Sequence, residues 1–90
     1  MGRIDVFATC LVCGTNKGLE RHHVFYGTGL RQLSEKHGMV AILCHECHRG
    51  RRGVHLNHEL DIELKQEFQR RFEEGHSRAE FMRIFGRSWL

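Results

Sequence analysis

Proline is absent from this 90-residue sequence, and tryptophan and tyrosine occur only once each. Without proline there is no rigid linker, and no repeat or low-complexity tract divides the chain. Long hydrophobic runs are missing too, since residues 1–14 contain no stretch that suits a signal peptide and no later segment is long enough to span a membrane. We therefore expect a single domain over residues 1–90, without membrane contact, in a reducing cytoplasm.

Lysine is scarce, with three lysines beside eleven arginines and a formal net charge of +3. Arginine is suited to bidentate contacts with phosphate, so this choice favours nucleic acid as the partner. Three of the arginines, Arg49, Arg51 and Arg52, closely follow His48. They are candidates for phosphate contacts that bring affinity without sequence specificity, although any single arginine could equally belong to a solvated surface.

The four cysteines form two Cys-x-x-Cys pairs, Cys10 with Cys13 and Cys44 with Cys47, separated by thirty residues. A chain of this length buries only a small core, so an added constraint is expected. Gly14 after the first pair permits the tight turn in which both sulfurs face one ion. The pattern predicts a structural Zn²⁺ bound by all four thiolates, with disulfides or a redox role as the alternatives.

Residues 10–55 combine strand and turn patterns. Aromatic, β-branched and apolar runs predict two strands that pair with each other, and helices are expected between and after them. These elements span residues 19–26 (strand), 30–36 (helix) and 39–43 (strand), followed by a helix from Cys44. The last helix carries His48 before Gly50 and Gly53 interrupt it.

The pattern becomes helical in residues 57–90. Apolar side chains recur every four positions at Leu60, Leu64, Phe68 and Phe72. Asn57 can cap the start of this helix, and Gly75 lies where its end is expected. Ser77 then opens a capping-box pattern for a second helix that stops at Gly86. We expect an α+β fold in which two C-terminal helices cover a zinc-stapled unit or a second copy of it.

Eight histidines exceed what a structural zinc site needs. Adjacent side chains of a strand point to opposite faces, so His22 and His23 cannot readily share one role. One could bind a metal while the other faces a substrate, because a neutral imidazole can act as a general base near pH 7. A divalent cation opposite the base would stabilise charge on a scissile phosphate. The doublet thus favours phosphodiester hydrolysis, with a coincidental surface pair as the alternative.

These residues resemble the HNH endonuclease family. The resemblance is carried by Cys10-x-x-Cys13, by the His22-His23 doublet in a strand, and by Cys44-x-x-Cys47-His48 at a helix start. The resemblance covers residues 10–55, about half of the chain. This region is similar to the zinc-bearing branch of the family, whose ββα-metal fold holds a catalytic divalent ion between a hairpin and a helix. The remainder of the chain, through residues 85–90, also resembles small HNH proteins encoded by phages and prophages of Gram-positive bacteria.

The resemblance implies that His23 is the general base and that His22 and His48 bind a catalytic Mg²⁺, Mn²⁺, Ni²⁺ or Zn²⁺, with His55 as a further ligand. It also implies DNA as the substrate, the cytoplasm of a bacterial host as the location, and a second copy or a phage protein as a partner. His48 and His55 would lie about 10 Å apart along an unbroken helix. A glycine between them must bend the chain, or His55 instead contacts a phosphate or caps the helix.

The sequence departs from the family pattern in one respect. Family members usually carry an asparagine that buttresses the loop orienting the base, and residues 24–47 contain none. His37, Gln32 or Asn57 are candidates to replace it. The departure favours the alternative of a non-catalytic zinc-binding DNA-recognition module. A third hypothesis is a zinc-stapled protein-interaction adaptor, which would leave the arginine excess and the histidines unexplained.

Overall fold

The computed structural model describes residues 4–90, so the first three residues of the predicted domain lie outside it. Two strands and four helices form in this part of the chain, which confirms the α+β class. Their bounds are β1 Leu19–His23, α1 Leu30–Lys36, β2 Val40–Cys44, α2 His45–Arg49, α3 His58–Glu73 and α4 Arg78–Phe85. No helix within residues 4–90 is both long and apolar enough to cross a membrane.

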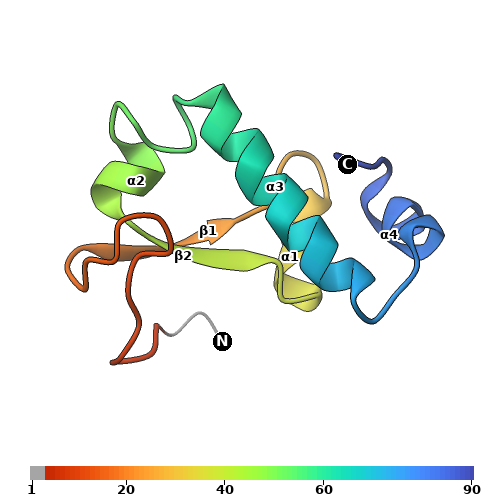
Figure 1. The fold of residues 1–90 in the computed structure, drawn as a ribbon, viewed down its shortest axis with the longest axis horizontal. Coiled ribbons are helices and arrows are strands. Elements are labelled where there is room, and N and C mark those ends of the chain that lie inside the picture. The colour runs from red at the N-terminus through yellow and green to blue at the C-terminus, as the bar shows by residue number, and fades with distance from the viewer. Residues whose placement is uncertain (1–3) are drawn as a thin grey trace.

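The two strands pair as an antiparallel hairpin, as predicted. Leu19 lies opposite Cys44, and His23 lies opposite Val40. Since β1 and β2 are joined through α1 and not by a tight turn, the hairpin carries a helix at the end where β1 stops (Figure 1). The register places the end of β2, with Cys44, beside the beginning of β1.

The predicted extent of the first strand was wrong at its C-terminal end, since β1 stops at His23 and not at residue 26. One more ladder hydrogen bond follows, from the Val24 amide to the Met39 carbonyl at 3.0 Å. Both backbone groups of Phe25 then form hydrogen bonds with one side chain. The Ser34 hydroxyl accepts from the Phe25 amide at 3.0 Å and donates to the Phe25 carbonyl at 2.6 Å. The serine replaces the neighbouring strand as the partner, so the chain leaves the sheet here.

The caps predicted for the C-terminal helices are present. The Asn57 side chain accepts from the Leu60 amide at 3.2 Å at the start of α3, and the Ser77 hydroxyl accepts from the Glu80 amide at 3.0 Å at the start of α4. Gly86 ends α4 with φ near +88°, a conformation that favours glycine. These local signals are sufficient to fix both helix starts and the end of α4.

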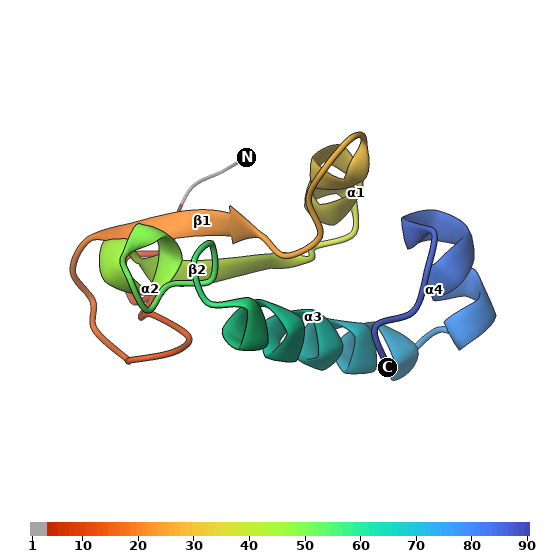
Figure 2. The same cartoon turned by 90° about the horizontal axis from the view of Figure 1, so that it is seen from above.

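α3 joins the two halves of the molecule. It runs along the hairpin, while α2 lies at one end of the strands and α4 lies beyond the other (Figures 1 and 2). Leu64, Phe68 and Phe72 form its buried face. Phe25 from the N-terminal half packs against Phe81 of α4, with ring centroids 5.3 Å apart and neither side chain exposed. Residues 57–90 therefore complete one core with the hairpin, which holds the α2 end of the molecule in place.

Candidate active site

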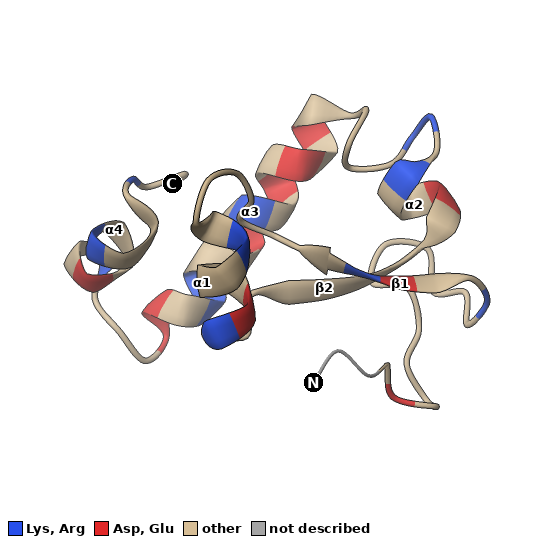
Figure 3. Ribbon diagram, turned by 180° about the vertical axis from the view of Figure 1, so that it is seen from behind, with Lys and Arg blue, Asp and Glu red and all other residues tan. Residues whose placement is uncertain are grey.

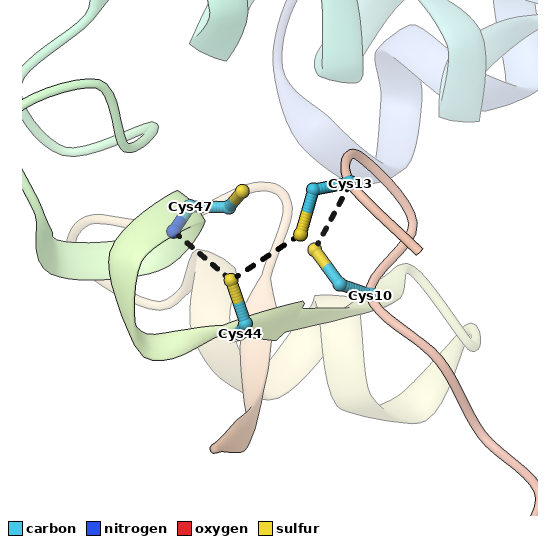
Figure 4. Close-up of side chains that lie close together, drawn as sticks. All are labelled: Cys10, Cys13, Cys44 and Cys47. Atoms are coloured by element: carbon cyan, nitrogen blue, oxygen red, sulfur yellow. Dashed lines mark hydrogen bonds between the residues drawn. The ribbon is translucent and has the colours of Figure 1, made fainter. Parts of the chain in front are cut away.

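The four cysteines converge at the α2 end of the hairpin (Figure 4). Their sulfur atoms all lie within 4.8 Å of one another, and the sulfurs of Cys13 and Cys44 are 3.7 Å apart. Tetrahedral coordination with zinc–sulfur bonds near 2.3 Å requires sulfur separations of about 3.8 Å. The backbone amides of Cys13 and Cys47 donate to the sulfurs of Cys10 and Cys44 at 3.5 and 3.4 Å. The predicted cluster is formed, and it could hold a metal such as zinc.

The electrostatics of the sulfurs favour a bound cation. Burial acts to raise the pKa of the Cys10 thiol, but backbone amides, including that of Cys13, donate to the sulfur and lower the pKa to about 6. Burial, reinforced by the neighbouring sulfurs, raises the pKa of Cys47. Four thiolates at this spacing repel one another strongly unless a cation lies among them.

Three histidines form a second cluster from three different segments. His22 comes from β1, His48 from α2 and His55 from the loop after α2, and one nitrogen of each lies within 4.8 Å of the others. The Nε2 atoms of His48 and His55 are 3.1 Å apart. His22 is only 2% exposed, and within the described residues its Nε2 has no hydrogen-bond partner. A buried nitrogen without a partner, facing two other imidazoles, is the environment of a metal ligand.

A bend in the backbone brings His55 back to His48. α2 ends at Arg49, and the following loop folds against it through hydrogen bonds from the His55 amide to the His48 carbonyl at 3.4 Å and from the Val54 amide to the Cys47 carbonyl at 2.9 Å. Gly53 makes this possible, since a Cβ there would lie 2.8 Å from the His48 carbonyl oxygen. The interruption predicted from the glycines is confirmed, and His55 joins the cluster.

Glu20 orients His48, a role that the sequence reading missed. One carboxylate oxygen of Glu20 lies 2.7 Å from His48 Nδ1 and the other lies 3.0 Å from His45 Nδ1. These hydrogen bonds, from His45 first and His48 second, lower the pKa of Glu20 to about 2. A proton held on His48 Nδ1 leaves the Nε2 lone pair free to face the cluster. The available signal was strand alternation, which puts Glu20 on the same face as His22.

A buried polar network backs the three histidines. The Tyr26 hydroxyl donates to Asp61 at 2.8 Å, Asp61 pairs with Lys65 at 2.5 Å, and the Lys65 ammonium lies 4.0 Å from the centre of the Tyr26 ring. That ring in turn lies against His22 and His55. Burial first, and then the nearby histidines, lower the pKa of His22 to about 3, which keeps its lone pair available. α3 thus holds Tyr26, a lining residue of the site, through Asp61 and Lys65.

His23 is partly exposed beside an ion pair. Its Nε2 lies 3.7 Å from Glu35, whose two carboxylate oxygens accept from the Arg21 guanidinium at 2.7 and 2.6 Å. The Arg21 hydrogen bonds lower the pKa of Glu35 to about 2. The Glu35 side chain on α1 therefore stays ionised next to His23.

The three candidates for the missing asparagine lie elsewhere. His37 lies against the rings of Phe72 and Phe85, Asn57 caps α3, and Gln32 is exposed. The side chain that bonds to the backbone of the loop after His23 is the fully buried Ser34 described above. None of the three predicted candidates makes these contacts, and the Ser34 hydroxyl makes both of them with the backbone of Phe25.

A cavity of about 320 Å³ opens over the histidines. It is lined by Arg21, His22, His23, Tyr26, Arg31, His48, Arg49 and His55. Of the three predicted arginines, Arg49 lines the cavity, whereas Arg51 and Arg52 are exposed on the adjoining turn. Lysine and arginine residues therefore occur on α1, on β1 and from α2 into the next turn (Figure 3). Arg21 and Arg31 were missed because they are distant in sequence from the histidine at position 48.

No family model, curated protein or solved structure matches this chain. The resemblance to HNH endonucleases therefore rests on the motif residues alone. What the protein does has to be argued from the two side-chain clusters and the cavity above them.

Proposed function

We propose that the protein is a metal-dependent endonuclease of the HNH type that hydrolyses phosphodiester bonds in DNA. The observation that carries the proposal is the buried, unpartnered Nε2 of His22, which faces His48 and His55 below a cavity lined by arginines. Nitrogen ligands converging under a basic cavity suit a metal ion that engages a phosphate.

The donor set fits a divalent transition metal. His22, His48 and His55 would hold it, and imidazole nitrogens suit ions such as Zn²⁺ and Ni²⁺ better than Mg²⁺, which prefers oxygen. When bound, such an ion stabilises charge on the scissile phosphate and the leaving oxygen. The Glu20 carboxylate keeps the His48 proton on Nδ1, away from the ligand position.

His23 would act as the general base of the reaction. With its Nε2–H directed towards Glu35, Nδ1 is the nitrogen that accepts a proton from the attacking water. The Glu35 carboxylate then favours the imidazolium that forms, and Arg21 holds that carboxylate in place. Ser34 fixes the backbone just after the base through its contacts with Phe25.

The cysteine cluster would serve as a structural zinc site. Cys44 caps α2, and Cys47 directly precedes His48, so a zinc ion there would fix the helix that carries a ligand of the second site. The alternative of a non-catalytic zinc-binding DNA module keeps this role. It is favoured by the absence of an asparagine in residues 24–47 and is opposed by the convergence of three histidines that such a module does not need.

A plasmid-cleavage assay tests the proposal. The chain would be freed of loosely bound metal with EDTA and supplied with Mg²⁺, Mn²⁺, Ni²⁺ or Zn²⁺, as wild type, as His23→Ala and as His58→Ala, the last being an exposed histidine outside the cavity. We expect metal-dependent nicking by wild type and His58→Ala, and its loss in His23→Ala with zinc content unchanged. Equal cleavage by all three would refute the assignment of the base. DNA binding without cleavage by any of them would favour the non-catalytic module.

A further inference from the structure

We propose that Arg31 binds a phosphate of the substrate strand on the α1 side of the cavity, away from the arginines that follow His48. This rests on the proposed function, because it assigns a binding contact at the same site. Arg31 lies in the first turn of α1 and lines the cavity together with the histidines. No sequence motif pointed to it.

The ion pairs of the cavity single out Arg31. Both terminal nitrogens of Arg21 bind Glu35, and Arg49 lies 3.4 Å from Glu20. In contrast to Arg21 and Arg49, Arg31 forms no ion pair and no side-chain hydrogen bond with any described residue. No carboxylate belongs to the cavity lining, so within the described chain its charge is left for an anion from outside.

The positions of the basic side chains define a path for the substrate. Arg31 is on α1 at one end of the hairpin, whereas Arg49 is on α2 at the other end, and the histidines of β1 lie between them. The blue segments in Figure 3 follow this order from α1 across β1 to α2 and its turn. A strand that places its scissile phosphate over the histidines would therefore meet a cation on both sides of the cleavage point, which fixes the path of the strand across the site.

The contact has the properties of backbone recognition. Arg31 is exposed, and among the described residues neither an ion pair nor a hydrogen bond holds its guanidinium. A free guanidinium suits a phosphate contact, which carries no sequence information. A single phosphate contact makes the slope of log affinity against log salt concentration more negative by about 0.9 for duplex DNA and by about 0.7 for a single strand. The contribution of Arg31 to affinity would therefore fall by a factor of about 3.5 between 50 and 200 mM salt for duplex DNA.

The test compares DNA binding by the full zinc-loaded chain as wild type, Arg31→Gln and Arg83→Gln. Arg83 is a matched control, since it is an exposed arginine of α4, outside the cavity lining. Fluorescence anisotropy with two duplexes of unrelated sequence, between 50 and 200 mM salt and without added divalent ions, gives the slope for each protein. We expect Arg31→Gln to make the slope less steep by about 0.9 on both duplexes and Arg83→Gln to leave it unchanged.

Three outcomes would overturn the proposal: a slope for Arg31→Gln equal to that of wild type, an equal loss in Arg83→Gln, or a loss confined to one of the two sequences. The nuclease proposal fails separately. If wild type never cuts plasmid but Arg31→Gln still makes the slope less steep, the phosphate contact stands and catalysis is refuted. If wild type cuts and the slopes agree, catalysis stands and the role of Arg31 is refuted.

Discussion

Replacing Glu20 with alanine should weaken metal binding at the three-histidine cluster without removing any ligand. Its carboxylate accepts from His48 Nδ1 at 2.7 Å and from His45 Nδ1 at 3.0 Å, and lies 3.4 Å from Arg49 Nε. Without it, the His48 proton can move to Nε2, the nitrogen that faces His55. Loss of such an outer carboxylate typically lowers metal affinity by about 10- to 100-fold, equivalent to roughly 1.4–2.7 kcal/mol.

The assay is a calorimetric titration of the zinc-loaded chain with Ni²⁺, joined to nitrogen NMR of the imidazole rings to identify the proton position in His48. Glu20→Gln should lose less affinity than Glu20→Ala, because an amide oxygen can still accept from one imidazole. Glu63→Ala, an exposed carboxylate of α3, is the control. Unchanged Ni²⁺ affinity in Glu20→Ala, with one zinc per chain retained, would refute the orienting role.

Three further predictions concern stability. Lys65→Met leaves the buried Asp61 without its ion-pair partner and should lower the free energy of unfolding, measured in urea, by about 3–5 kcal/mol. The double variant Asp61→Leu with Lys65→Met removes both charges and should recover most of this lost stability. Ser34→Ala leaves a buried backbone amide without its acceptor and should cost about 1–3 kcal/mol in the same assay, with a loss below about 0.5 kcal/mol contradicting this role of Ser34. Arg21 lowers the pKa of Glu35 from its ordinary 4.5 to about 2. The stabilisation of the folded chain by this ion pair is therefore complete above about pH 5 and is lost as the pH falls from 4.5 towards 2. The difference in unfolding free energy between wild type and Glu35→Gln should therefore shrink over this pH range. Loss of zinc at low pH affects both proteins alike and cancels in the difference. A difference that stays constant would argue against the ion pair.

Local chemistry made much of this structure predictable. The spacing of Cys10, Cys13, Cys44 and Cys47 was sufficient to expect a four-sulfur cluster, because each pair is set by a short turn and the hairpin then joins the pairs. Helix starts were equally accessible, since a cap depends on one side chain and an amide three residues further on. The α+β class followed from these elements together.

Contacts between distant segments were not predictable in the same way. The sequence left His55 either as a ligand, if a glycine bent the chain, or as a phosphate contact or helix cap. The path of the loop decides between these, and periodicity does not report that path. Strand alternation could place Glu20 on the face of His22, but its partner His48 comes from α2, and the place of Arg31 in the cavity depends on how α1 packs. The first strand was predicted too long because hydrophobic pattern cannot anticipate that Ser34 takes over the hydrogen bonds of Phe25.

The close packing of Gly53 against α2 has a consequence for how this chain can diverge or be engineered. Residues 50–54 form a link whose length is fixed, because the amides of Val54 and His55 are in register with the carbonyls of Cys47 and His48. One residue inserted or deleted between residues 50 and 53 would displace His55 from the site although all three histidines remained in the sequence. The turn at Gly75, where no neighbour lies within 4 Å of an added Cβ, carries no such restriction. Tags, reporters or further domains are therefore best inserted between α3 and α4, and homologues should vary in length there and not between α2 and α3.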